Sequence, residues 1–166
     1  MHIAVEDPVA PDVVALLDQH LAVTKDTAPP ESCHALDAGE LRAPHITFLA
    51  ARDDDGTLLG MGALADLGNA HGEIKSMHTA SGARGRGIAA AVLTRLVEIA
   101  REAGYTRVSL ETGTQDFFEP AHRLYERHGL IECGPFDTYV ADPHSRFYTL
   151  ALEALEAREA GEALDR

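Results

Sequence analysis

Arg84-Gly85-Arg86-Gly87-Ile88-Ala89 is the stretch from which the rest of the sequence is best interpreted. It follows a run of strand-forming residues that ends near Thr79, and it precedes an apolar helical pattern. A strand, a glycine-rich turn and a helix N-terminus together present backbone N–H groups and the positive end of a helix dipole. The stretch therefore predicts a turn that binds an anionic group such as a pyrophosphate. A surface turn that only joins two elements is the alternative.

Length and composition predict a single domain. The chain has 166 residues, 45% of them hydrophobic, which is enough for one domain with its own core. We assign that domain to residues 1–152. Residues 153–166 form a helix-prone tail with little apolar face, which predicts a segment that is solvated or used at a subunit contact, as in a homodimer. The net charge of −13 argues against nucleic acid or an anionic membrane as the main partner.

The cysteine and histidine content predicts neither a disulfide framework nor a metal site. Cys33 and Cys133 are too few and too far apart, and the histidines lack the spacing of metal ligands. The N-terminus has no basic region followed by a long apolar run, and no later window is apolar enough to span a bilayer. These features predict a soluble, cytoplasmic protein.

Apolar periodicity and turn residues divide the chain into strands and helices. The helical pattern is clearest from Ile88 to Glu102, where Gly104 follows as a stop signal. Hairpin-connected strands that feed two later helices predict a mixed α/β fold, with a mostly antiparallel central sheet of about seven strands and helices on both faces. Strands are expected at 3–5, 46–52, 58–67, 73–79, 106–112, 131–135 and 147–152, and helices from Asp12, weakly within 27–44 with an interruption at Gly39, at 88–102 and at 120–128.

The glycine turn also fits the fingerprint of dinucleotide-binding proteins. Gly85-x-Gly87-x-x-Ala90 satisfies G-x-G-x-x-[GA], and Glu111 ends the following strand, near where an acidic residue would bind a ribose hydroxyl. The context favours this NAD(P)-binding interpretation less, because three meandering strands precede the turn and too little chain follows for a doubly wound sheet. A nucleoside triphosphate site is disfavoured because the turn lacks Gly-Lys-Ser or Gly-Lys-Thr.

A second motif lies downstream of the turn. Arg84-x-x-Gly87-x-Ala89 is followed, after one predicted helix and one strand, by Ala121-x-x-Leu124-Tyr125 and Gly129. This pair of motifs resembles the GCN5-related N-acetyltransferase (GNAT) family, and the predicted order of elements is similar to that of the family fold. Leu110-Glu111-Thr112-Gly113 and the long loop 136–147 resemble a bacterial subgroup of small-molecule acetyltransferases.

The resemblance implies an enzyme that moves an acetyl group from acetyl-CoA to a primary amine of a small molecule by direct attack. The coenzyme pyrophosphate would lie on the glycine turn, and the preceding strand would run beside the pantetheine and the acetyl group. An N–H of that strand would stabilise the tetrahedral oxyanion. The implied coenzyme-binding residues are Met77, His78, Thr79, Arg84, Gly85, Arg86, Gly87, Ile88 and Ala89.

The resemblance also implies the proton-transfer groups. Tyr125 matches the family's proton donor to the departing thiolate, with a packing tyrosine as the alternative. Glu73 is our first choice for the base that deprotonates the ammonium, and Glu111 is the second candidate. If no bulge intervenes, strand alternation places Glu73, Lys75 and Met77 on one face, where Lys75 would make Glu73 a poorer base. A solvated edge carboxylate is the alternative for Glu73.

Candidate substrate contacts flank the weak second helix, stand near the end of the strand expected at 106–112, or lie in the long C-terminal loop. They are His34, His45, Glu111, Asp137 and Tyr139, with solvated histidines as the alternative for the first two. Two residues depart from the family pattern. Phe118 stands where many relatives carry an asparagine that contacts the pantetheine, so the resemblance does not imply that contact here, and Leu130 replaces a usual phenylalanine.

Ligand-dependent melting separates these interpretations. We expect acetyl-CoA to raise the melting temperature and NAD or NADP to leave it unchanged, because a ligand that binds only the native state stabilises that state. Stabilisation by NAD or NADP alone would contradict the assignment. A coenzyme A sensor without catalysis would also be stabilised by acetyl-CoA, so turnover with amines has to be measured as well.

Overall fold

The structure, a computed structural model, describes residues 1–153 and contains a seven-stranded sheet. The strand order is β1-β2-β3-β4-β5-β7-β6, in which β4 and β5 run parallel and all other neighbours are antiparallel. The strands are β1 (His2–Val5), β2 (Ile46–Arg52), β3 (Leu58–Asp66), β4 (His71–Thr79), β5 (Arg107–Gly113), β6 (Ile131–Cys133) and β7 (Ser145–Ala151), and the helices are α1 (Pro11–Thr27), α2 (Ala38–Leu41), α3 (Ile88–Glu102) and α4 (Glu119–Arg127).

The predicted order of elements and the predicted mixed, mostly antiparallel sheet are confirmed. Differences lie at the ends of elements. The structure begins β4 at His71 rather than at Glu73, and Gly39 lies inside the short α2, which Asp37 and Glu40 cap reciprocally, rather than interrupting it. Except for Glu153, the predicted tail of residues 153–166 lies outside the described residues. Within residues 1–153, no helix is long and apolar enough to cross a membrane.

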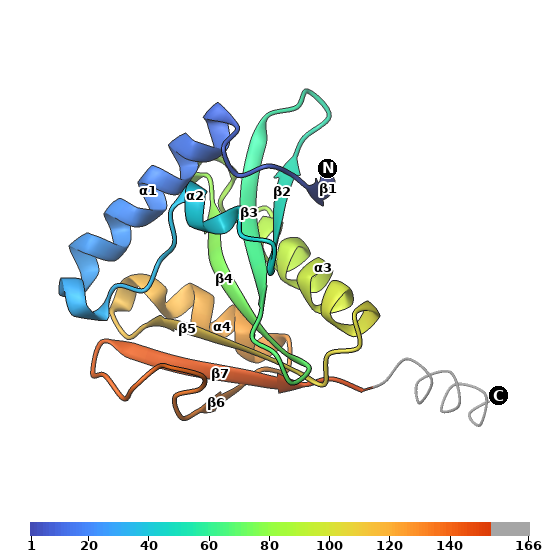
Figure 1. Cartoon of the computed structure of the whole chain (residues 1–166). Helices are drawn as coiled ribbons and strands as arrows, with labels where there is room; N and C mark the ends of the chain where they lie inside the picture. The colour runs from blue at the N-terminus through green and yellow to red at the C-terminus, as the bar shows by residue number, and fades with distance from the viewer. Residues whose placement is uncertain (154–166) are drawn as a thin grey trace.

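Each face of the sheet carries its own core. Val13, Leu16 and Leu17 of α1 pack with Phe48 and other residues of β2 and β3 on one face. The apolar side of α3 and two residues of α4 pack on the other face, in the larger cluster. Figure 1 shows α1 and α3 on opposite sides of β2–β4, with β5 and β7 crossing at a steep angle to β2 and β3. Strand alternation explains the division, because successive β2 residues enter opposite cores.

Gly62 allows α3 to lie close to the sheet. A Cβ at this position would lie 2.6 Å from the sulfur of Met77, 2.8 Å from Val92 Cγ1 and 3.0 Å from Leu96 Cδ1. Both Val92 and Leu96 are fully buried. The packing of the larger core therefore requires a residue without a side chain at position 62 of β3.

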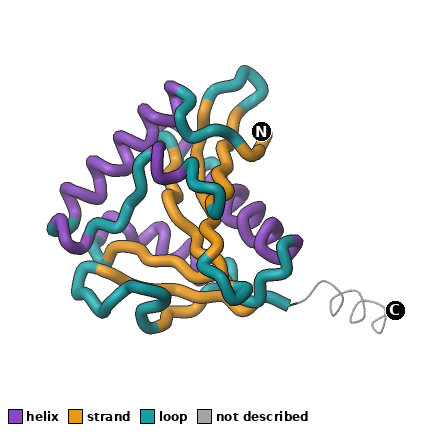
Figure 2. Tube along the Cα trace, in the orientation of Figure 1, coloured by secondary structure: helices purple, strands orange, loops and turns teal. Residues whose placement is uncertain are grey.

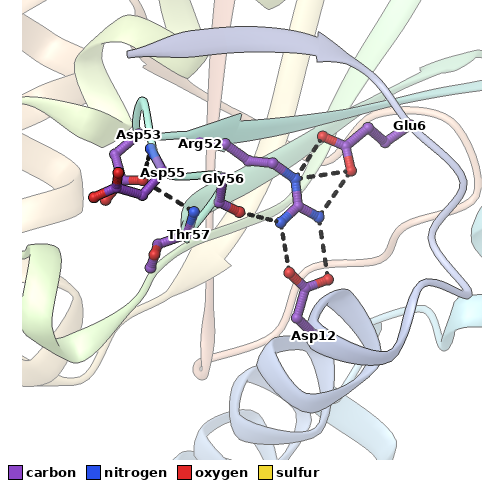
Figure 3. Close-up of polar contacts among 7 residues, drawn as sticks. All are labelled: Glu6, Asp12, Arg52, Asp53, Asp55, Gly56 and Thr57. Carbon is purple, nitrogen blue, oxygen red and sulfur yellow. Dashed lines mark hydrogen bonds and ion pairs between the residues drawn. The ribbon is translucent and has the colours of Figure 1, made fainter.

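Arg52 connects three segments at the far end of β2 (Figure 3). Its Nε donates to both carboxylate oxygens of Glu6, at 3.1 and 2.9 Å, and one of its terminal nitrogens donates to the Gly56 carbonyl at 2.9 Å. Its two terminal nitrogens donate to the two oxygens of Asp12, at 2.5 and 3.1 Å. The hydrogen bond from Arg52 lowers the pKa of Asp12. This one guanidinium holds the β1–α1 connection and the start of α1 against the β2–β3 turn.

The feature that positions the functional site is the separation of β4 from β5. The two strands pair only from His71 with Arg107 to Ile74 with Leu110. On the other side of β4, the register with β3 shifts so that Ser76 and Met77 both face Gly62, which is a β-bulge, and Ser76 takes a φ of 54°. The bulge turns Met77 toward the core of α3, whereas Glu73 and Lys75 share the opposite face. Met77 therefore does not continue that face as unbroken alternation would require.

We expect Gly62→Ala to destabilise the protein by about 1–3 kcal/mol, because the added methyl group overpacks the contact between β3 and α3. Chemical denaturation of the wild type and the variant measures this change. Gly82→Ala is the matched control, since a Cβ at Gly82 meets no atom within 4 Å. Equal losses in both variants would show that close approach at Gly62 is not the cause.

Candidate active site

The glycine turn has the backbone geometry that its sequence predicts. Gly85 and Gly87 have φ values of 77° and 78°, in the left-handed region that favours glycine. A Cβ at either position would meet no atom within 4 Å, so glycine is required there by conformation and not by crowding. The N–H of Ala91 bonds to the Gly87 carbonyl at 3.1 Å, so the N–H groups of the preceding α3 residues have no partner within the helix.

A cavity of about 130 Å³ lies where β4 and β5 separate. Its walls come from the second half of α1 and the segment after it, from both strands, from α4 and from the loop between β6 and β7. Figure 2 shows the irregular segments that follow α1 and β6 at the same end of the molecule. The polar lining residues include His20, Ser32, His34, Glu73, Lys75, Ser76, Glu111, Tyr125, Tyr139 and His144.

Tyr125 lies at the cavity wall, close to the C-terminal end of α4, and is 6% exposed. Its ring packs 5.8 Å from that of Tyr148. Burial, with a further contribution from the negative charge of Glu111, raises the pKa of Tyr125 above its ordinary value. The phenol therefore keeps its proton at neutral pH, as a group that donates a proton to a thiolate must.

Glu73 is buried and belongs to a hydrogen-bonded cluster with Lys75 and Tyr139. Its Oε1 accepts a hydrogen bond from Lys75 Nζ at 2.9 Å and another, short one from the Tyr139 hydroxyl. Lys75 Nζ also donates to the Tyr139 oxygen at 2.9 Å. The predicted proximity of Glu73 and Lys75 is therefore present, and Tyr139 joins them from a loop 66 residues downstream.

Glu111 is the second carboxylate of the cavity and has a different environment. Its Oε1 accepts a hydrogen bond from Ser145 Oγ at 2.9 Å. Burial raises the pKa of Glu111, while the Ser145 hydrogen bond and the charges of His34 and Lys75 act in the opposite direction. Two carboxylates on one cavity thus have distinct partners, an arrangement that allows them distinct roles.

The structure brings some of the predicted substrate contacts together and leaves others apart. His34 and Tyr139 line the cavity, with ring centroids 5.1 Å apart in an edge-to-face arrangement. His45 is exposed beside β2, and Asp137 is an exposed loop residue with a φ of 52°; neither lines the cavity. Phe118, at the position of the family asparagine, does line it.

Sequence reasoning missed His20, which lines the cavity and contacts the predicted coenzyme-binding residue His78. His20 of α1 lies beside His78 of β4, with their Nδ1 atoms 3.2 Å apart and their rings edge to face. Burial and the neighbouring His78 lower the pKa of His20 to about 4. The pKa of His78 is also lowered, chiefly by burial. The helical position of His20 gave no signal, because only the tertiary packing of α1 on β4 brings the two rings together.

Residues 14–130 match the Acetyltransferase (GNAT) family. The chain belongs to this family. Two bacterial relatives match it over nearly their whole length. The uncharacterized N-acetyltransferase YsnE of Bacillus subtilis is 46% identical over 152 residues, which span 92% of this chain and 100% of YsnE. The IAA acetyltransferase of Azospirillum brasilense is 40% identical over 146 residues, which span 87% of this chain and 94% of that protein.

Solved structures agree with this placement. A Klebsiella pneumoniae protein assigned as an acyl-CoA N-acyltransferase superposes with a TM-score of 0.75 at 25% identity, over 92% of this chain and 97% of that one. The predicted family and fold are thereby confirmed, and the GNAT protein is an acyl-CoA-dependent N-acetyltransferase. The relatives support neither a dinucleotide-binding protein nor a coenzyme A sensor without catalysis.

The His20–His78 pair predicts a pH dependence of stability. The pKa of His20 is about 4 in the folded state, against an ordinary value of 6.5. As the pH falls, the imidazole of His20 therefore takes up a proton in the unfolded chain before it does so in the folded chain. The contribution of neutral His20 to the free energy of unfolding is therefore fully present above pH 6.5 and is lost as the pH falls toward 4. We expect His20→Asn to flatten this fall in the free energy of unfolding, measured by urea denaturation across that range.

His45→Asn is the matched control, because His45 is exposed and lies outside the cavity. It should retain the slope of the wild type. If His20→Asn also retained that slope, the titration of His20 would not be the source of the pH dependence.

Proposed function

We propose that this GNAT protein transfers an acetyl group from acetyl-CoA to a primary amine of a small molecule that binds between β4 and β5. The observation that carries the proposal is the separation of these strands beside Tyr125, with two carboxylates on the walls of the same cavity. A thioester placed there would have a proton donor for its sulfur and a carboxylate for the amine proton within one cavity.

The donor would bind along β4 and the glycine turn. The pyrophosphate would accept hydrogen bonds from the N–H groups of residues 84–89, and Arg84 and Arg86 would add charge. The pantetheine would follow Met77, His78 and Thr79, where β4 has parted from β5. An N–H of this segment would stabilise the oxyanion of the tetrahedral intermediate, since donors fixed before the reaction need no reorganisation.

In the proposed reaction, the nitrogen loses two protons and the sulfur gains one. A pocket carboxylate removes one proton from the acceptor ammonium, and the freed lone pair attacks the thioester carbonyl carbon. The C–S bond breaks while a C–N bond persists, and the departing thiolate takes the proton of Tyr125. The nitrogen then loses a second proton, which restores Tyr125, and one net proton leaves through the carboxylate to solvent.

The acceptor would enter from the side of α1 and the loop between β6 and β7. The cavity of about 130 Å³ accommodates on the order of ten water-sized groups, which suits a compact amine-bearing end of a molecule. We propose His34, Tyr139 and Glu111 as contacts for this end, since all three line the cavity. His45 and Asp137 would contact only a part of the acceptor that extends beyond it.

We expect Tyr125→Phe to lower kcat by about 10²–10⁴-fold, because it removes the proton donor and keeps the ring that packs on Tyr148. Thiol release from acetyl-CoA measures turnover with a panel of short alkylamines, amino acids, arylalkylamines and aminosugars.

Tyr105→Phe is the matched control, because Tyr105 is a half-buried tyrosine that does not line the cavity. It should keep the activity of the wild type. Turnover by Tyr125→Phe at the same level as the control would contradict the role of the phenol, and no turnover by the wild type with any amine of the panel would contradict the proposed function.

A further inference from the structure

We infer that Glu73 is a positioning residue that ties the loop of residues 134–144 to β4 through Tyr139, and that Glu111 is the carboxylate that accepts the acceptor's proton. The inference rests on the proposed function for the role of Glu111. Its first half concerns the architecture of the cavity and stands independently of the substrate.

Hydrogen bonds already engage the carboxylate of Glu73. Its Oε1 accepts from Lys75 Nζ and from the Tyr139 hydroxyl, and these two donors also contact one another. The side chain of Glu73 is 7% exposed and that of Lys75 is 13% exposed, so both charges are largely removed from water. A proton taken up by this carboxylate, on either oxygen, would leave the ammonium of Lys75 without its counter-ion, which is costly for a buried pair.

Tyr139 provides the hydrogen-bonded contact between the loop and β4, next to the packing of Phe136 on His71 of the same strand at a centroid distance of 5.7 Å. Its ring packs against Phe136, Phe147 and His34 at centroid distances of 5.1–5.6 Å. Only its hydroxyl reaches the carboxylate of Glu73 on β4. The hydrogen bond joins residues 66 positions apart in the sequence. It connects the loop between β6 and β7 to β4, which is next to neither of those two strands in the sheet.

Two further contacts hold the same loop near its end. Ser32 Oγ, in the segment after α1, donates to Asp142 Oδ2 at 2.5 Å, and Thr114 Oγ1 donates to the Pro143 carbonyl at 2.9 Å. With Tyr139 between these contacts and β6, the loop closes one side of the cavity. Glu73 therefore acts on the acceptor's binding site by fixing its wall.

Glu111 is engaged differently. Its hydrogen bond from Ser145 uses a neutral hydroxyl, and no ion pair within residues 1–153 involves it. The titratable groups that influence or surround it are Glu73 and Lys75 of β4, Tyr125 of α4, and Cys33 and His34 after α1. Burial raises the pKa of Glu111, which brings a carboxylate closer to the range in which a general base is effective.

Hydrogen–deuterium exchange tests the loop contact without any knowledge of the acceptor. In Tyr139→Phe and Glu73→Ala, which remove the donor and the acceptor of this hydrogen bond, we expect the amides of residues 136–141 to exchange about tenfold faster or more, because local opening loses its tether. Glu111→Gln and Tyr105→Phe should leave this exchange as in the wild type, since the amide oxygen at position 111 can still accept from Ser145. Unchanged exchange in folded Tyr139→Phe would overturn the positioning role.

The pH dependence of kcat tests the choice of base, with the panel amine that gives the highest turnover. Glu111→Gln should lose the acidic limb of the profile and about 10²–10⁴-fold in kcat, and Glu111→Asp should restore part of both. Glu73→Gln and Tyr139→Phe should keep the acidic limb, with a raised KM for the amine and a loss of kcat below about tenfold.

The opposite pattern, in which Glu73→Gln loses the limb and Glu111→Gln keeps it, would overturn the inference. Its failure is distinguishable from failure of the proposed function. If the proposed function fails, the wild type itself will show no turnover with any amine, and the role of Glu111 as a base fails with it. The exchange measurements would still decide the role of Glu73.

Discussion

The early end of the β4–β5 ladder is the constraint on which the site depends. Four residue pairs join these parallel strands, and beyond Ile74 and Leu110 they diverge. The bulge at Ser76 and Met77 bends β4 at the same place, and an added twist is the usual consequence of such a bulge. The sheet stays continuous because β3 still pairs with β4 beyond the bulge, so the opening is supported on one side by a complete ladder. The cavity lined by β4 and β5 lies at this opening.

The two carboxylates in this opening illustrate how position in a sheet assigns chemical environment. Glu73 precedes the point of divergence and faces a lysine two residues along its own strand. Glu111 follows the divergence on β5 and faces a serine of β7. The two side chains lie on adjacent strands and line one cavity, yet an ion pair balances one of them and a neutral hydroxyl contacts the other. Adjacent acids with unlike partners can be differently protonated at one pH.

Local sequence patterns predicted most of the fold. The order of elements followed from periodicity and turn residues, and the two positive-φ glycines followed from the strand–turn–helix context of residues 84–89. The bulge was not predictable, because a strand pattern of alternating residues gives no sign of one extra residue, and for that reason Met77 lies on the other face. The contacts of Tyr139 with Glu73 and of His20 with His78 join residues 66 and 58 positions apart, which no local pattern encodes. The resemblance supplied Tyr125, while its burial and raised pKa emerged only from packing.

The cavity is assembled from two kinds of structural parts. The segment proposed for the coenzyme is built from β4, the glycine turn and α3, which belong to the sheet and its larger core. The wall proposed for the acceptor is built from irregular chain after α1 and after β6, which Ser32 and Asp142 join to each other. Of residues 28–37 and 134–144, only Leu36 packs against either core, so most changes of residue type in these two segments do not touch the packing of the sheet. If the proposed function holds, the part of the chain that selects the acceptor is thus separate from the part that binds the donor, and one can be altered without the other.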